Sequence, residues 1–274
     1  MNYSITEVCE AFDISPSIYY YKPTGSSKQD IDMMRSIKEI SASVNHTYGK
    51  RRMMLDLREL GYSIGVRKTK RLMNACGISV VMPHKRHHYP DSGQEFKFAP
   101  NLLNREFSPL SLNTHWVGDM TYIRHCHGWS YLACVMDLHS KEIVGYALSE
   151  SPNAALAKRA LINAINKKQP DTGHLLFHSD QGTQYSAKLF RQCLSLQGIT
   201  QSMSRRGNCW DNAVMERFFR TLKSERLNNL SFIKHQAVIT ETDRFIRFYN
   251  YKRRHSSIGY LTPHQKFLQF KKAA

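Results

Sequence analysis

The chain has 274 residues, of which 41% are hydrophobic and 11% aromatic, and its 39 Lys and Arg against 22 Asp and Glu leave a formal net charge of +17. This apolar content allows a packed core and excludes a chain that is disordered throughout. The excess of positive charge favours a polyanionic partner, above all nucleic acid; the alternative is an ordinary basic protein.

Sorting signals and metal motifs are absent from the sequence. No segment reaches eighteen apolar residues, and the start, MNYSITEVCE, has no basic stretch followed by an apolar run. None of the six cysteines forms a C-x-x-C pair, which argues against a zinc ribbon and a disulfide scaffold. We therefore expect no membrane association, and a cytoplasmic protein with reduced thiols.

Residues 1–25 are predicted to form a short helix-turn-helix segment. Within SITEVCEAFDISPSIYYY, Ser15 suits an N-cap and Pro16 suits the first position of the second helix. Any helical hairpin would give a similar pattern, so the pattern alone does not assign DNA binding to this segment.

Residues 26–82 are predicted to form a helical DNA-binding module. Helices are expected at 30–43, about 50–60 and about 66–75, the last two ending at a glycine. The third alternates an apolar stripe with basic residues, which suits a helix lying on DNA; a solvated basic face is the alternative. The candidate DNA contacts are Arg51, Arg52, Arg67, Lys68, Lys70 and Arg71.

Residues 83–110 are predicted to be an extended, basic interdomain linker. The segment contains PHKRHHYPDSG and few apolar residues at regular spacing. Its histidines have no cysteine pair or acidic partners nearby, so a solvated basic run is a better interpretation than a metal site.

The pattern changes in residues 111–228, which are predicted to form an α/β domain. Three β-rich runs, 114–125, 128–140 and 142–150, precede a helix, a short strand, a second helix and a further strand. The amphipathic helix DNAVMERFFRTLKSE follows. This order matches a ribonuclease-H-like fold, a layered α/β core with a mixed five-stranded sheet, preceded here by small all-α helix-turn-helix modules.

Three acidic residues lie where such a fold would bring them together. Asp119 is in the middle of the first strand, Asp180 directly follows the fourth, and Glu216 lies inside the late helix. Magnesium prefers oxygen ligands, and a pair of such ions can activate an attacking hydroxyl and stabilise the leaving oxygen at phosphorus. We therefore expect these carboxylates to be catalytic and to bind Mg2+, with Mn2+ as a substitute.

Other acidic residues have simpler interpretations, because a lone aspartate is more often a cap or a salt bridge. Asp211 looks like the N-cap of the late helix, and Asp137 ends its strand and suits a turn. In the late helix, Glu216, Arg220 and Lys223 share one face by their intervals of three and four. A carboxylate flanked by cations suits a metal beside a phosphate backbone; a surface salt-bridge ladder would leave the two aspartates unexplained.

Residues beside these carboxylates are expected to support them. His178, Gln181 and Gln184 flank Asp180 and are candidates for positioning water or phosphate. Tyr122 is a candidate for DNA contact or for core packing.

Long segments of the chain resemble a known family. DMTYI, HSDQGTQY, SMSRRGNCWDNAVMERFFRTLKSE and YNYKRRHSSIGYLTPHQ look like successive signatures of the insertion-sequence transposases of the IS-three type. They belong there to the second-frame product, OrfB, which is related to retroviral integrases with a DDE catalytic core. Residues 45–78 are similar to the family's N-terminal DNA-binding module. The resemblance covers nearly the whole chain and implies that Asp119, Asp180 and Glu216 are its metal-binding triad.

The resemblance also implies an activity and partners. The family's enzymes cleave a DNA strand at the ends of their own mobile element and join the exposed 3′ hydroxyl to a new phosphodiester, first between the two ends and then at a target. Self-association is implied, as is an upstream-frame, OrfA-like protein or a fusion with it. Retroviral integrases carry an N-terminal zinc site of paired His and Cys, which this sequence lacks, so we expect no zinc.

Basic residues outside the helical module are further candidate DNA contacts. The loop SMSRRGNCW is expected to be a mobile clamp or an exposed basic loop, and residues 229–274 a basic helical extension suited to phosphate contacts. The candidates are Arg205, Arg206, Arg220, Lys223, Arg253 and Arg254.

Two other functions are open to this sequence. One is a related integrase or nuclease that hydrolyses nucleic acid without transposing it, and the other is a DNA-binding regulator with an inactive core. The presence of all three acids at coherent spacing favours an active enzyme, which would be nucleoid-associated in a bacterial cytoplasm when bound to DNA.

Overall fold

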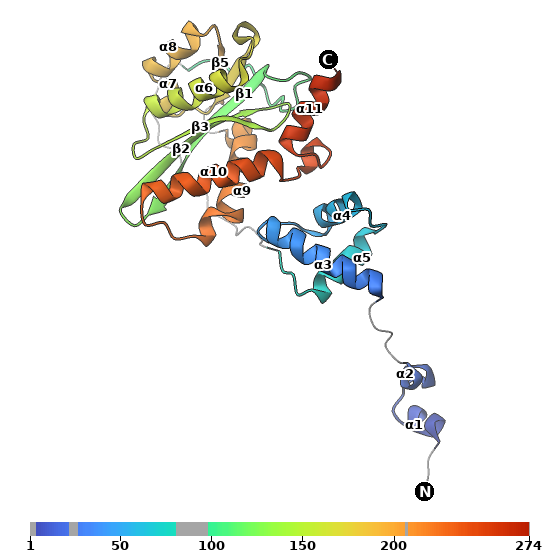
Figure 1. Ribbon diagram of the computed structural model, residues 1–274. Helices are drawn as coiled ribbons and strands as arrows, with labels where there is room; N and C mark the ends of the chain where they lie inside the picture. Colours follow the sequence, from blue (N-terminus) through green and yellow to red (C-terminus); the bar gives the residue numbers. More distant parts are fainter. Residues whose placement is uncertain (1–3, 22–26, 81–97, 206–207, 274) are drawn as a thin grey trace.

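The structure is a computed structural model that describes residues 4–21, 27–80, 98–205 and 208–273. Two short helices, a three-helix module and a larger α/β domain follow one another along the chain (Figure 1). The helices before the sheet are α1 (Ile5–Ala11), α2 (Pro16–Tyr20), α3 (Lys28–Ser43), α4 (Lys50–Glu59) and α5 (Val66–Ala75). The strands are β1 (His115–His125), β2 (Gly128–Asp137), β3 (Ile143–Ser149), β4 (Leu176–Ser179) and β5 (Thr200–Met203). The helices of the α/β domain are α6 (Ala154–Lys168), α7 (Thr183–Ser186), α8 (Lys188–Leu196), α9 (Ala213–Glu225), α10 (His235–Tyr251) and α11 (Pro263–Ala273).

None of the helices in the described ranges combines the length and the apolar content that crossing a bilayer requires.

The two N-terminal helices form where the sequence predicts them. Ser15 caps α2 by accepting a hydrogen bond from Ser17 N, and Pro16 occupies the first helical position. The apolar side chains of Phe12 and Ile18 are 73% and 63% exposed. Because so little apolar surface is buried, this pair of helices has almost no core of its own.

The helices α3, α4 and α5 enclose a small hydrophobic core. Ile37, Leu57 and Leu72 each contribute a buried side chain to it, one from each helix. The turns after α4 and α5 pass through Gly61 and Gly77, whose φ angles of 89° and 67° disfavour residues with a Cβ. These glycines confirm the predicted ends of the two helices.

The strands form one mixed sheet in the order β3-β2-β1-β4-β5. The first three strands are antiparallel neighbours, whereas β4 runs parallel to both β1 and β5. β4 pairs with β1 only over residues 115–117, so the two strands diverge beyond that point. This arrangement confirms the ribonuclease-H-like fold predicted from the order of elements.

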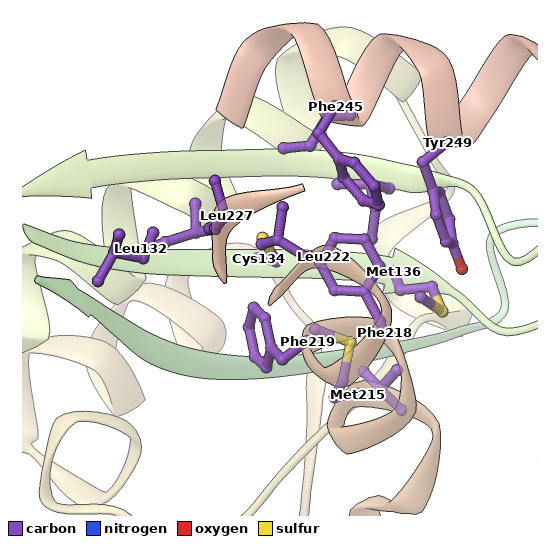
Figure 2. Close-up of a cluster of buried hydrophobic side chains, with 14 of the residues drawn as sticks. Leu132, Cys134, Met136, Met215, Phe218, Phe219, Leu222, Leu227, Phe245 and Tyr249 are labelled. Atoms are coloured by element: carbon purple, nitrogen blue, oxygen red, sulfur yellow. The ribbon is translucent and has the colours of Figure 1, made fainter. Parts of the chain in front are cut away.

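Helices cover both faces of the sheet (Figure 1). On one face, α6 and α8 pack over a core that contains Phe177 and Phe190. On the other, Phe218 of α9 and Phe245 of α10 share a core with Cys134 and Met136 of β2 (Figure 2). The late helix α9 packs on the second face, which carries the candidate site described below.

The α/β domain begins before residue 111. Residues 98–110, which were expected to belong to a linker, pack against the core: Leu103 is buried, and Met203 N donates a hydrogen bond to Pro100 O at 3.2 Å. Residues 83–97 of that expected linker lie outside the described residues. The sequence pattern did not reveal this packing, because a segment that covers a core without regular secondary structure has no regular spacing of apolar residues.

The domain also continues beyond residue 228, and its C-terminal part holds the three-helix module. Phe248 of α10 packs against the core of the α/β domain and against that of the module. Tyr48 Oη donates to Lys252 O at 2.8 Å and accepts from Arg254 N at 3.0 Å. The region expected to be a basic extension is therefore a structural connection between the two parts.

Candidate active site

The two aspartates lie near each other where the pairing of β1 with β4 ends. The parallel register places Val117 opposite His178, and Asp119 and Asp180 each follow two residues later along their chains. Residues two positions apart share a face of a strand. Val117 belongs to the core under α9 and α10, so the Asp119 side chain faces that side, and Asp180 and Glu216 are near enough to repel its carboxylate.

Backbone N–H groups hold both carboxylates in place. Asp119 Oδ1 accepts from Met120 N at 2.7 Å, and Asp180 Oδ1 accepts from Gly182 N at 3.0 Å. A Cβ on Gly182 would lie 2.9 Å from Asp180 Oδ1, closer than carbon and oxygen tolerate. The glycine in HSDQG therefore allows the backbone to fold against the Asp180 carboxylate.

Glu216 is carried by α9, whose other face is anchored in the core. Phe218 and Leu222 are buried, as the sequence predicts, and Met215 is buried with them (Figure 2). Glu216 itself is exposed on the opposite side of the helix. A helix fixed by three large apolar side chains gives this carboxylate a defined position relative to the sheet.

Electrostatics connect the three acids. Burial raises the pKa of Asp119 well above its usual range, and repulsion from Asp180 and then from Glu216 raises it further, while Lys223 opposes the rise. Burial also raises the pKa of Asp180. Within the described part of the chain, no three His, Cys, Asp or Glu side chains are arranged closely enough to hold a metal ion as they stand. The acids nevertheless form a region of mutual repulsion that a cation would relieve.

The thiol that stands opposite Asp119 is not available to a soft metal. Cys134 stands opposite Asp119 in the strand pair, but burial raises the pKa of its thiol well above the ordinary value and keeps it protonated. Carboxylate oxygens remain, and these are the ligands that Mg2+ and Mn2+ prefer.

The His178 side chain is held by hydrogen bonds to Ser202 and Ser204. Ser202 Oγ accepts from two backbone N–H groups, so its hydroxyl donates to His178 Nδ1 at 2.8 Å. His178 Nε2–H then donates to Ser204 Oγ at 3.2 Å. Burial lowers the pKa of His178 to about 4, so the ring is neutral. Both nitrogens are occupied, and the expected role in positioning water or phosphate is wrong for this residue.

The expectation that Asp211 caps the late helix is also wrong. The N-cap of α9 is Asn212, and Asp211 lies one residue earlier, in the 3-10 helix η2 (Cys209–Asn212), with its side chain fully buried. Asp137 is the turn residue that was predicted, since its Oδ2 accepts from Ser140 N at 2.8 Å.

Comparisons with known proteins place the chain in a family. Residues 110–209 and 197–263 each match an "Integrase core domain", and residues 28–86 match an "HTH-like domain". A 31 kDa protein of insertion element IS600 from Shigella sonnei is 36% identical over 93% of this chain and 96% of its own length. The chain belongs to the insertion-sequence transposases. The putative transposase InsK of element IS150 from Escherichia coli K12 is 36% identical to this transposase over 95% of this chain and 92% of its own.

Solved structures are similar at lower identity. The catalytic core domain of HTLV-2 integrase, in complex with magnesium, superimposes with a TM-score of 0.45 at 16% identity over 57% of this transposase and 97% of that chain. The catalytic domain of Mos1 mariner transposase has a TM-score of 0.42 at 19% identity, over 49% of this transposase and 70% of that chain.

The basic residues predicted on α5 of the transposase fall into two pairs. Arg67 and Lys70 are exposed. Lys68 Nζ lies 2.7 Å from Asp30 Oδ1, and Arg71 Nη2 lies 3.0 Å from Asp30 Oδ2. Part of the charge on Lys68 and Arg71 is thus neutralised by one carboxylate of α3, which the sequence did not indicate.

The two candidates on α4 also differ. Arg51 is exposed, whereas Arg52 is half-buried, with its guanidinium carbon 5.5 Å from the centre of the Tyr48 ring. Only Arg51 has the unobstructed surface position that was expected of both.

The candidate DNA contacts near the carboxylates lie at the surface of the protein. Arg220 is exposed on α9, and Lys223 Nζ lies 4.7 Å from the centre of the exposed Tyr122 ring, which identifies Tyr122 as a surface residue. Arg205 is half-exposed and paired with Asp211, and Arg206 lies outside the described residues.

Arg253 and Arg254 do not have the exposed positions that were expected of DNA contacts. Both are buried: Arg253 Nη2 lies 2.6 Å from Glu225 Oε1, and Arg254 Nε lies 2.6 Å from Asp56 Oδ1. Arg254 also contacts Glu59, with Nη2 at 2.5 Å from Oε2. This geometry favours a structural role over contact with phosphate, because a paired and buried guanidinium has little surface left for DNA.

Asn101 and Arg105 were missed by the sequence analysis. Both contact Asp211, over separations of 110 and 106 residues, from a segment that was expected to be a linker. No local pattern marks them, since each has a role only once the chain has folded.

Proposed function

We propose that this transposase cleaves DNA at the ends of its element and joins the exposed 3′ hydroxyl to a new phosphodiester at Asp119, Asp180 and Glu216. The observation that supports this is that Asp180 and Glu216 both lie close enough to Asp119 to raise its pKa, where the parallel pairing of β1 with β4 ends. Family membership supports the same class of reaction, that of a DDE-type polynucleotidyl transferase.

The three carboxylates are the groups that would hold a divalent metal ion. Their hard oxygen donors and their mutual repulsion fit Mg2+, with Mn2+ as a substitute. When bound, the metal supplies a more acidic attacking hydroxyl and stabilises charge on the leaving oxygen.

The protein's own residues would present DNA to this site. Arg220 and Lys223 follow Glu216 at four and seven residues on α9, so all three share one helix face. Cations beside the carboxylates can hold the phosphate backbone, and the buried face of α9 keeps them at a fixed distance from the sheet.

An in vitro strand-transfer assay tests the proposal. Labelled element ends would be incubated with the full chain, with and without magnesium, and the products separated by length. We expect metal-dependent products longer than the substrate. Only shorter products would mean a nuclease, and DNA binding without any reaction would mean a regulator with an inactive core; either result would overturn the proposal.

We further propose that the three-helix module binds the element ends through α5. Each phosphate contact adds roughly 0.9 to the slope of log affinity against log salt concentration. Replacing Arg67 and Lys70 with Ala is therefore expected to lower that slope by up to roughly 1.8. The pair is exposed, so its loss should leave the fold intact.

The double variant of Lys68 and Arg71 is the matched control for this module. We expect a smaller change in slope from it, because Asp30 already neutralises part of that charge. Fluorescence anisotropy titrations at several salt concentrations measure both slopes. If both variants kept the salt slope of the wild-type protein, α5 would be a solvated basic face without phosphate contacts.

We propose, finally, that the active assembly contains at least two protomers and an OrfA-like partner from an upstream frame. Strand transfer joins two DNA ends, and linking a second DNA-binding module raises affinity through effective concentration. The isolated chain is then expected to bind element ends weakly and with little preference over random DNA. End-binding titrations of the chain and of its OrfA fusion at one salt concentration test this. Equal affinity and specificity would remove the need for the partner.

A further inference from the structure

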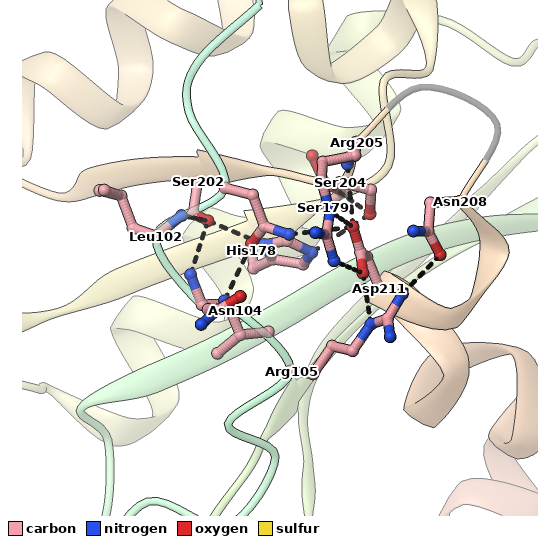
Figure 3. Close-up of polar contacts among 12 residues, drawn as sticks. Leu102, Asn104, Arg105, His178, Ser179, Ser202, Ser204, Arg205, Asn208 and Asp211 are labelled. Atoms are coloured by element: carbon pink, nitrogen blue, oxygen red, sulfur yellow. Dashed lines mark hydrogen bonds and ion pairs between the residues drawn. The ribbon is translucent and has the colours of Figure 1, made fainter.

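Asp211 is a buried carboxylate that no step of the proposed reaction uses (Figure 3). Its Oδ2 accepts from Asn101 Nδ2 at 2.9 Å, and its Oδ1 accepts from Arg105 Nε at 2.8 Å. Arg205 donates three more hydrogen bonds, from N, Nε and Nη2, each at 3.0 Å. We call Asp211, Asn101, Arg105 and Arg205 the Asp211 clasp.

The clasp gathers segments that are distant in sequence around a carboxylate with no exposed surface. The side chain of Asp211 is 0% exposed, whereas those of Arg105 and Arg205 are 44% and 54% exposed. These donors hold the pKa of Asp211 well below its usual range, so it stays ionised. An ionised, buried carboxylate is favourable only where its partners are placed correctly, which makes the arrangement geometrically specific.

The clasp lies between the two elements that carry catalytic carboxylates. On the sheet side, Ser204 N donates to Ser179 O at 2.9 Å, next to Asp180, and Arg205 follows Ser204 directly. On the helix side, Asp211 lies five residues before Glu216. The clasp therefore spans the connection from the end of β5 to the first turn of α9.

The first turn of α9 has a buried side chain, Met215, but no side-chain cap. Its N-cap residue, Asn212, makes no side-chain hydrogen bond to the helix. Arg105 adds a second contact to the same connection, because its Nη2 donates to Asn208 Oδ1 at 2.9 Å (Figure 3). Contacts made before the helix begins therefore add to the packing of Met215 in orienting this turn and the side chain of Glu216.

We propose that Asp211 is a positioning residue for DNA cleavage and transfer: held by Arg105 and Arg205, it sets Glu216 relative to Asp180. The inference rests on the proposed function, and Asp211 touches neither DNA nor metal in it. Arg205 then serves the clasp, in contrast to the DNA clamp that the sequence predicts for this loop.

Asp211→Asn tests the proposal against a matched control, Asp137→Asn. Both aspartates are buried, and Asp137 likewise accepts hydrogen bonds, from Ser140 N at 2.8 Å and Asn113 N at 2.9 Å, but in the β2–β3 turn. Both variants lose stability. Only Asp211→Asn is expected to raise the magnesium concentration for half-maximal cleavage, by about tenfold or more, as loss of groups that orient metal ligands usually does. DNA affinity should stay within about twofold of wild type, since a paired clasp supplies no contact to DNA.

Arg105 provides a second route if Asp211→Asn fails to fold. Its side chain is half-exposed, so Arg105→Gln should fold, raise the magnesium requirement in the same direction, and be partly rescued by Arg105→Lys. A readout independent of activity is 19F NMR of 5-fluorotryptophan protein, because Trp210 lies beside Asp211 in η2. We expect its resonance to shift or broaden in Asp211→Asn and Arg105→Gln and to stay unchanged in Asp137→Asn.

The outcomes separate this inference from the proposed function. Asp211→Asn, Arg105→Gln and Asp137→Asn could all have the same magnesium requirement while replacement of a catalytic carboxylate still abolishes activity. This result would overturn the positioning role of the clasp alone. Weaker DNA binding by Arg105→Gln at an unchanged magnesium requirement would overturn it in favour of a DNA contact. Full activity after loss of a catalytic carboxylate would instead overturn the proposed function.

Discussion

Asp119→Asn, Asp180→Asn and Glu216→Gln are each expected to abolish strand cleavage and transfer while leaving DNA binding largely intact. Each amide is nearly isosteric with the acid it replaces but is a much poorer ligand for a hard cation. Charge stabilisation by a bound metal is worth several kcal/mol, and about 1.4 kcal/mol is tenfold in rate, so a loss of about a thousandfold is expected. Single-turnover cleavage of labelled element ends under saturating magnesium measures it.

Asp171→Asn is the control for these three variants. Its side chain is 74% exposed and contacts His174 in a surface turn, so its replacement should not change the rate. Near-normal transfer by any one of the three variants would remove that residue from the site. Loss of DNA binding in step with activity would indicate misfolding rather than loss of a ligand, and circular dichroism would identify that case.

Arg253→Ala is expected to destabilise the fold strongly. Two of its guanidinium nitrogens donate to Glu225 at 2.7 Å and 2.6 Å, and the two side chains are only 8% and 13% exposed. Removing one partner of a buried ion pair leaves the other charge unpaired and costs about 3 kcal/mol or more in the free energy of unfolding. Urea denaturation followed by circular dichroism measures the loss.

Arg244→Ala, in α10, is the matched control. Arg244 pairs with Glu241 at 2.6 Å, but its side chain is 66% exposed, so its loss should cost about 1 kcal/mol or less. Similar midpoints for the two variants would contradict the structural role of Arg253. If Arg253→Ala instead lowered DNA affinity and its salt slope without loss of stability, the phosphate contact predicted from the sequence would hold.

The sequence by itself determined most elements of the fold and the candidate acids. The β-rich runs of β1 and β2 and the helical period of α6 and α9 are local patterns, and each appears in the structure within a few residues of the predicted limits. The order of these elements was sufficient for the ribonuclease-H-like fold. Asp119, Asp180 and Glu216 were recognisable because each stands at a particular place in a local element, the middle of a strand, the end of a strand and the face of a helix.

Only the tertiary structure decided which charged residues serve the fold. Arg105, Arg253 and Arg254 look alike in sequence, as exposed basic residues in polar segments, yet each pairs with a carboxylate far along the chain. The same holds for Asp211, whose position before a helix predicts a cap but whose partners bury it instead. An ion pair depends on where two long side chains meet after folding. Neither the composition nor the spacing of apolar residues gives the distance between two residues that are far apart in the sequence. This is why the sequence indicated the candidate acids but could not separate arginines that stay exposed from arginines that hold the protein together.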